Sequence, residues 1–358
     1  MKMKKNKIRV ISAVVSAIML ASSASAFAKF DAYNDPDGFT LGHYEVEVNQ
    51  EQRADTEKLY EQRPKNERQF ENLSRGLVAV PGENGTLVSW RFLGTDSNSL
   101  TYNLYCSGEK LNDKPITTTN FFHTGASTNA EYTLKEVENG EETGVEYTTT
   151  AWDKNYIGFK VTEREGYNID DGAVADLDGD GEYEILLRRV PSMDVNTRTS
   201  YPVIEAYKTD GTHMWTIDIG PNEINEVDIN FLAYDMDGDG KAEVIMRSFE
   251  GTTDGKGNTT GDTNGDGITD YSKSESNLAI FKDRQYIVST PEFLSIYDGE
   301  TGEETDRTDL KPSKEPLSDW SYRYSDTGRL TKRASHYLFG LAYLDGVTPS
   351  VVMVRGAW

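Results

Sequence analysis

The sequence predicts an all-β protein in which a small β-sandwich is followed by blades of an incomplete β-propeller. Three observations predict this class. Short runs of alternating apolar and polar residues, separated by turn residues, fill residues 67–165. In 166–358 a unit of two predicted hairpins recurs along the chain, which is the sequence signature of propeller blades. A glycine-rich acidic loop follows the opening strand in each of the first two copies.

Residues 1–28 have the pattern of a secretory signal peptide. Basic residues crowd the first nine positions, an apolar run extends from Val10 to Ala21, and small residues lead to a cleavage point after Ala26 or Ala28. The apolar run is shorter than the roughly 20 residues that a membrane-spanning helix needs. We therefore expect a secreted, extracellular protein without a membrane span.

The next two regions differ in periodicity. Residues 29–66 are polar and acidic with little periodicity, and we expect a polar linker there. Strand-like alternation then fills 67–165, where Asn139-Gly140 separates two runs and favours a tight hairpin turn. Short strands at this spacing predict a small sandwich, with Trp90 in its core.

The region 166–358 is predicted to form a partial propeller. Asp176 and Asp235 open equivalent acidic loops and stand 59 residues apart. A second half-repeat follows each loop, at 203–207 and at 293–297, and the longer second copy carries an insertion at 251–275.

A third copy, without the acids, opens at Gly340. A propeller needs about four blades to close. We therefore expect a truncated chain, a remainder supplied from elsewhere, or an arc that stays open.

Three segments share the pattern D-x-[DN]-G-D-G-x-x-[DE]. The glycines let the backbone turn tightly, and the acids supply the hard oxygen ligands that Ca²⁺ prefers, six to eight of them at about 2.3–2.6 Å. Zinc sites usually contain His or Cys, and neither occurs in these loops, which argues against zinc. The predicted ligands are Asp176, Asp178, Asp180, the Glu182 carbonyl and Glu184; Asp235, Asp237, Asp239, the Lys241 carbonyl and Glu243; and Asp262, Asn264, Asp266, the Ile268 carbonyl and Asp270.

These loops do not follow the EF-hand pattern. An EF-hand places its bidentate acid at the twelfth position, where this sequence has Leu187, Met246 and Lys273. Because so many acids repel one another without metal, we expect the fold to depend on calcium. Acidic turns that bind no metal are the alternative.

The overall composition narrows the partners. The net charge of −23 and the pI of about 4.6 argue against nucleic acid and anionic membranes. Cys106 is the single cysteine, so no disulfide within the chain can form. An exported protein of this kind must rely on core burial, metals or both.

The ordered motifs resemble the bacterial rhamnogalacturonan lyases of polysaccharide lyase family 11. The segments that carry the resemblance are RQFENLSRGLVAV (68–80), LVSWRFLGT (87–95), DGAVADLDGDGEYEILL (171–187), IEAYKTDGTHMW (204–215), YDMDGDGKAEVIMRSFEGTTDG (234–255) and PEFLSIYDGETG (291–302). The resemblance implies an N-terminal β-sheet domain, a calcium-bearing propeller and the pectic polysaccharide rhamnogalacturonan I as substrate. It also implies that the general base lies beyond residue 358, so we name no catalytic residue.

The implied reaction is β-elimination, in which a base removes the C5 proton of galacturonate while cations neutralise the carboxylate. Candidate substrate-binding residues are Asp170 and Asp171, which stand where the family has an Asn-Asp pair, together with Arg333 and Arg355. The arginines could bind galacturonate carboxylates or form structural ion pairs. The two aspartates could bind metal or sugar, or lie in a solvated turn.

Two other functions remain open from the sequence. A non-catalytic, calcium-stabilised module could bind pectic polysaccharide or the cell surface, and an adhesion propeller of the integrin type could carry similar acidic loops. We expect a monomer.

Overall fold

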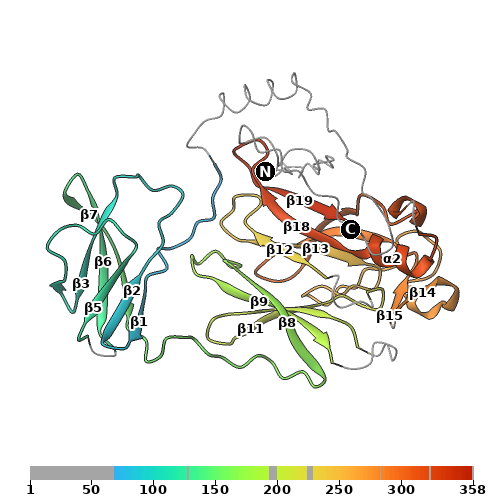
Figure 1. Cartoon of the computed structure of the whole chain (residues 1–358), viewed down its shortest axis with the longest axis horizontal. Helices are drawn as coiled ribbons and strands as arrows, with labels where there is room; N and C mark the ends of the chain where they lie inside the picture. Colours follow the sequence, from blue (N-terminus) through green and yellow to red (C-terminus); the bar gives the residue numbers. More distant parts are fainter. Residues whose placement is uncertain are drawn as a thin grey trace, which may run out of the picture. The chain divides into compact units, whose positions relative to one another are not determined.

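A computed structural model describes residues 68–126, 129–192, 200–223, 229–282, 284–321 and 324–356 (Figure 1). The predicted signal peptide and linker lie outside the described residues. Strands dominate what is described, and α2 (Thr327–Ser335) is accompanied only by short 3₁₀ turns. The all-β prediction is therefore confirmed. No helix in the described part of the chain has the length and apolar content that a bilayer crossing requires.

The N-terminal region forms two antiparallel sheets. One contains β1 (Val78–Gly82), β2 (Gly85–Ser89) and β5 (Asn120–Thr124), in the order β1-β2-β5. The other contains β3 (Thr101–Cys106), β4 (Glu109–Lys110), β6 (Glu131–Glu138) and β7 (Glu141–Thr150), in the order β4-β3-β6-β7.

The two N-terminal sheets share one hydrophobic core, as a sandwich requires. Val88 from the first sheet and Leu104 and Leu134 from the second are fully buried in it, and Trp90 is buried beside them. The predicted hairpin turn lies between β6 and β7, where Asn139 and Gly140 both have positive φ angles, 51° and 85°.

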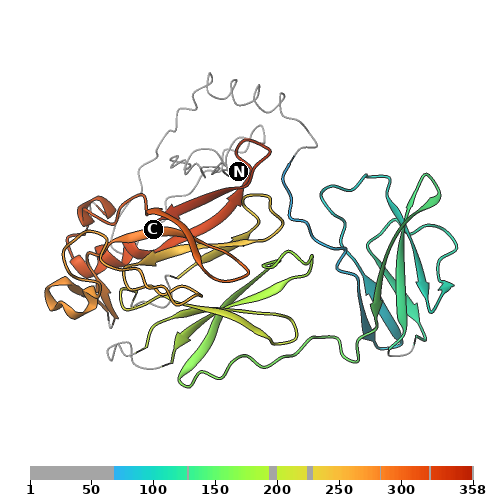
Figure 2. The same ribbon diagram turned by 180° about the vertical axis from the view of Figure 1, so that it is seen from behind.

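Two four-stranded antiparallel sheets follow (Figures 1 and 2). The first contains β8 (Tyr167–Ala175), β9 (Glu184–Pro191), β10 (Val203–Tyr207) and β11 (His213–Asp218), each paired with the next. The second contains β12 (Phe231–Tyr234), β13 (Glu243–Phe249), β16 (Glu292–Tyr297) and β17 (Glu304–Asp309) in the same arrangement. The predicted repeat is thus a repeated sheet.

The predicted insertion lies between β13 and β16. The predicted bounds, 251–275, contain the third acidic loop and the 3₁₀ turn η2 (Tyr271–Lys273). The extra chain continues past them through the 3₁₀ turn η3 (Glu275–Asn277) and the hairpin of β14 (Leu278–Phe281) with β15 (Arg284–Ile287). Because β13 still pairs with β16, the insertion leaves the sheet intact.

The third copy begins after η4 (Leu317–Trp320) and α2, where Asp326 caps the helix by accepting from the Arg329 N–H at 2.8 Å. It forms the hairpin β18 (Tyr337–Ala342) and β19 (Ser350–Arg355). Strand β12 contacts both β8 and β18, so the first strands of three successive sheets are neighbours. One core of Leu, Ile, Val, Met and aromatic side chains joins the two four-stranded sheets.

Candidate metal and substrate sites

The first acidic loop joins β8 to β9 and is held by its own first carboxylate. Asp176 Oδ1 accepts from the Gly179 N–H at 2.8 Å, and Oδ2 accepts from the Gly181 N–H at 2.9 Å. Both glycines have positive φ angles, 80° and 88°, which a side chain at these positions would strain. Asp180 Oδ1 accepts from the Glu182 N–H at 2.9 Å. The loop therefore curls around its acids.

The second and third loops repeat this hydrogen-bond pattern. Asp235 accepts from Gly238 and Gly240 at 2.6 and 3.1 Å. Asp262 accepts from Gly265 and Gly267 at 2.7 and 2.8 Å. The backbone thus folds these loops alike, as their shared sequence pattern predicts.

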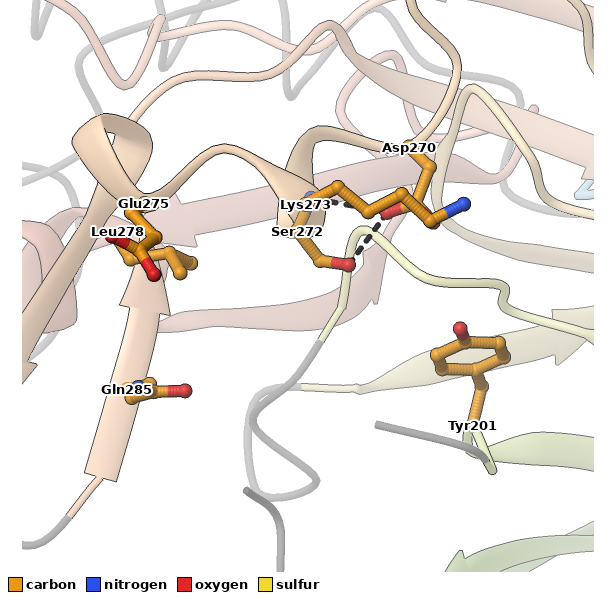
Figure 3. Close-up of a pocket in the computed structure, with 7 residues that line it drawn as sticks. All are labelled: Tyr201, Asp270, Ser272, Lys273, Glu275, Leu278 and Gln285. Carbon is orange, nitrogen blue, oxygen red and sulfur yellow. Dashed lines mark hydrogen bonds and ion pairs between the residues drawn. The ribbon is translucent and has the colours of Figure 1, made fainter. Parts of the chain in front are cut away.

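The ninth position separates the third loop from the first two. Glu184 Oε2 accepts from the Leu177 N–H at 2.7 Å, and Glu243 Oε2 accepts from the Met236 N–H at 2.8 Å, so each acid turns back onto its loop. Asp270 instead lies 3.0 Å from the Lys273 ammonium and accepts from the Ser272 hydroxyl at 2.5 Å, as Figure 3 shows. Its carboxylate is engaged away from the loop.

Asp270 also lines a surface hollow of about 340 Å³ (Figure 3). The other lining residues are Tyr201, Ser272, Lys273, Glu275, Leu278 and Gln285. Acidic and basic side chains both line this hollow, together with the apolar Leu278, so the lining does not indicate which class of ligand would bind there.

Two loops gather carboxylates closely enough to share one cation. Asp176, Asp178 and Glu184 offer oxygens within 4.8 Å of one another, and so do Asp235, Asp237 and Asp239; the acids of the third loop, all described, form no such group. Asp178 Oδ1 is a buried oxygen with no hydrogen-bond partner. All of these donors are hard oxygens. The first two loops therefore fit a hard divalent cation such as Ca²⁺.

Electrostatics in these loops also favour a cation. Burial, together with Asp237, Asp235 and Asp239, raises the pKa of Glu243 to about 8. Burial also raises the pKa of Asp176, against the hydrogen bonds from its glycines. An acid with a raised pKa ionises at a cost, which a bound cation would offset.

A lysine that the sequence analysis missed lies in the first group. Lys208 Nζ pairs with Asp178 Oδ2 and lies 3.5 Å from both Asp180 Oδ2 and Glu184 Oε1. Lys208 could have been found only from the pairing register of β9 and β10. Tyr207 pairs with Ile185, so Lys208 falls beside Glu184.

A segment before β1 contacts both loops. Gln69 Nε2 donates to the Asp235 carbonyl at 3.1 Å, and the Ser74 N–H donates to the Gly181 carbonyl at 2.9 Å. In the same segment, the pKa of Glu71 is raised, mainly by burial and then by the nearby charges of Asp235 and Asp176. The segment therefore ties the two loops together.

The candidate residues Asp170 and Asp171 lie on β8, with 37% and 56% of their side chains exposed. Arg188 of β9, buried, pairs with Asp170 and lies 3.9 Å from Asp171. Both aspartates are thus accessible to a ligand and oriented by a buried arginine. Arg188 was not among the candidate residues identified from the sequence.

The two candidate arginines differ in their surroundings. Arg355 has a fully buried side chain that pairs with Glu292 at 2.5 Å and donates to backbone carbonyls, including that of Pro312 at 3.1 Å. This placement favours the structural ion pair over substrate binding. Arg333, half-buried on α2, lies over the Tyr324 ring, 5.4 Å from its centre.

Comparison with known families then identifies the chain. Residues 158–358, more than half of it, match the model of the rhamnogalacturonan lyase family 11 C-terminal domain. The chain belongs to rhamnogalacturonan lyase family 11. Residues 68–152 match the β-sheet domain of rhamnogalacturonan I lyases. The first two loops, the β8 aspartates and Lys208 all fall within the match to the family 11 C-terminal domain.

Relatives within family 11 include two from Bacillus subtilis (strain 168). The chain is 37% identical to rhamnogalacturonan endolyase YesW over 304 residues, which cover 81% of the chain and 46% of YesW. It is also 37% identical to rhamnogalacturonan exolyase YesX over 306 residues, covering 81% of the chain and 47% of YesX. The chain thus spans about half the length of these relatives.

Solved structures of the family have the same fold in the shared part. The crystal structure of YesX matches with a TM-score of 0.68 at 38% identity, covering 82% of this chain and 48% of that one. The rhamnogalacturonan lyase PL11 of Bacillus licheniformis matches with a TM-score of 0.66 at 38% identity, covering 81% and 49%.

Proposed function

We propose that this protein acts in the breakdown of rhamnogalacturonan I by β-elimination. The observation that carries the proposal is the match, over 81% of the chain, to two proteins named as rhamnogalacturonan lyases. In this reaction a base takes the C5 proton of galacturonate, the electron pair forms the C4–C5 double bond, and the bond from C4 to O4 breaks. The rhamnose oxygen leaves with a proton, and no water is consumed.

The repeated sheets are proposed to be propeller blades. The contacts of β12 with β8 and β18 support this architecture, because the first strands of successive blades line the axis of a propeller. Exposed residues of β8 would then face the central channel.

The first two loops are proposed as calcium sites. Asp176, Asp178 and Glu184 would hold one ion, and Asp235, Asp237 and Asp239 another. Bound calcium would supply the positive charge that lets these carboxylates ionise together. A calcium site at the third loop remains a prediction from the sequence pattern, with Asp270 drawn toward Ser272 and Lys273.

The exposed aspartates of β8 are proposed to contact the polysaccharide. Asp170 and Asp171 present acceptor oxygens for sugar hydroxyls, and Arg188 holds the Asp170 carboxylate in place. Arg333 is retained as a candidate for a galacturonate carboxylate. Arg355 is left out because its guanidinium is buried against Glu292.

Secretion, cleavage of the signal peptide 1–28 and a monomeric state are proposed on the sequence pattern. They agree with a polymeric substrate that lies outside the cell. A size measurement on the mature protein, combined with N-terminal sequencing of the exported form, tests these three points together.

The experiment for the lyase proposal follows the unsaturated product by ultraviolet absorbance. Mature protein is incubated with rhamnogalacturonan I and Ca²⁺, and polygalacturonate without rhamnose serves as the substrate control. The expected result is a rise with rhamnogalacturonan I that EDTA abolishes and that polygalacturonate does not produce. A flat trace from folded, calcium-loaded protein that still binds the polymer would overturn the lyase proposal for this chain and favour a binding module.

A further inference from the structure

We propose that Lys208 is an internal cation that competes with calcium for the first loop and makes it the weaker of the two calcium sites. The inference rests on the calcium sites proposed above and goes beyond them by ranking the two loops. It also assigns the cause of the ranking to one side chain.

The position of Lys208 is the first observation. Its ammonium pairs with Asp178 and lies 3.5 Å from carboxylate oxygens of Asp180 and Glu184. Asp178 and Glu184 belong to the group of acids that would hold the metal. A calcium ion and this ammonium therefore draw on the same two carboxylates, and each cation weakens binding of the other.

The repeat supplies an internal comparison. In the first sheet Tyr207 pairs with Ile185, which follows Glu184; in the second, Tyr297 pairs with Val244, which follows Glu243. The residues after the tyrosines, Lys208 and Asp298, are thus equivalent. The second loop faces an acid at the position where the first loop faces a base.

The lysine of the second loop does not take over this role. Lys241 pairs with Glu300, which lies outside the loop, and its side chain is 38% exposed. Within the described residues, Lys241 forms no ion pair with Asp235, Asp237 or Asp239.

Lys208 carries a positive charge at neutral pH, as an unperturbed lysine does. Its side chain is about one-third exposed, so each contact is partly screened by solvent. Molecules in which the ammonium holds these carboxylates bind calcium less tightly, which lowers the apparent affinity of the first loop. We expect removal of the charge to strengthen calcium binding at the first loop by about three- to tenfold.

The test is isothermal titration calorimetry with Ca²⁺ on the full chain after EDTA treatment and buffer exchange. Asp178→Asn and Asp237→Asn variants assign the binding phases to the first and second loops. Lys208→Met is expected to tighten only the first-loop phase, and Lys208→Arg to keep the weak wild-type affinity. Lys241→Met is the matched control and is expected to leave both phases within about twofold.

Thermal denaturation separates competition from a purely structural ion pair. Competition predicts that Lys208→Met lowers the melting temperature in EDTA, where the acids lose the Lys208 ammonium, and leaves it unchanged in saturating Ca²⁺. An equal loss in both conditions, or a first-loop affinity that stays the same or falls in Lys208→Met, would overturn the proposal. Absence of calcium binding to wild type and variants alike would instead remove the calcium sites on which the proposal rests.

Discussion

Glu292 is the acidic centre of a buried charge cluster in the second four-stranded sheet. It pairs with Arg355 at 2.5 Å and with Arg247 at 3.4 Å, and all three side chains are at most 5% exposed. Burial alone would raise its pKa, but Lys314, Arg355 and Arg247 together lower it, so Glu292 is ionised. Arg355, from the third copy of the repeat, is thereby fastened to the second.

Glu292→Gln is expected to destabilise the protein strongly. The amide is similar in size but carries no charge, so the buried Arg355 guanidinium loses its Glu292 counter-ion, while Arg247 keeps its pair with Glu223. Breaking a buried pair in this way costs about 3–5 kcal/mol of unfolding free energy. Urea denaturation in saturating Ca²⁺ measures this. Glu303→Gln, on an exposed side chain, is the control and should change the free energy by less than about 0.5 kcal/mol; equal effects of the two variants would contradict the argument.

For individual residues, the sequence predicted which side chains could bind metal better than it predicted which side chains pair with each other. Asp176, Asp178 and Glu184 do come together, because their spacing and the glycines between them dictate a tight loop. Lys208 and Arg188 were missed because their roles depend on pairing between strands. The sequence alone allows Arg355 to be either an accessible substrate-binding arginine or a structural one. Its buried ion pair with Glu292 favours the structural role.

Elements were predicted more fully, because hydrophobic alternation and turn residues act locally. The hairpin at Asn139-Gly140 and the repeat strands β10 and β16 lie where expected. The 3₁₀ turns η2 and η3 and the β14–β15 hairpin between β13 and β16 were not anticipated. The hairpin at 278–287 follows a stretch rich in Gly, Asp and Thr, and such residues give little periodic signal.

The turn after β16 is predicted to be intolerant of any side chain at Gly299. A Cβ there would overlap the Ala242 carbonyl oxygen and lie 3.0 Å from the Leu177 carbonyl oxygen. Gly299 also accepts from the Trp215 indole N–H at 2.6 Å, so the turn cannot move without losing that bond. Gly299→Ala should therefore cost about 1–3 kcal/mol of unfolding free energy.

Gly261→Ala is the matched control for this turn. A Cβ at Gly261 meets nothing within 4 Å, and its φ angle is not positive. It should change the unfolding free energy by less than about 0.5 kcal/mol. Comparable melting temperatures for the Gly299 and Gly261 variants would mean that the turn yields and that the close approach does not constrain the fold.

For the whole molecule, family membership and fold class were within reach of the sequence, because the motifs occur in order along most of the chain. Whether the repeated sheets close into a ring could not be predicted, since closure depends on how many sheets are present and on how they meet. The proposed dependence of the fold on calcium lies between these cases. The sequence supplies the charge, −23 overall, and the structure shows how closely the loop acids approach.

Calcium removal is expected to lower the melting temperature, and more so at pH 8 than at pH 5.5. The pKa of Glu243 is about 8 in the folded chain without metal, well above that of a free glutamate. Between these two values the folded state holds a proton that the unfolded state has released, so stability without calcium falls as pH rises. Bound calcium replaces that proton and removes the penalty.

Thermal denaturation at both pH values, with Ca²⁺ and with EDTA, measures the difference. Glu243→Gln should weaken the pH dependence of the melting temperature without Ca²⁺. A calcium effect that is equal at the two pH values, or absent, would contradict the assignment of Glu243 to a metal loop.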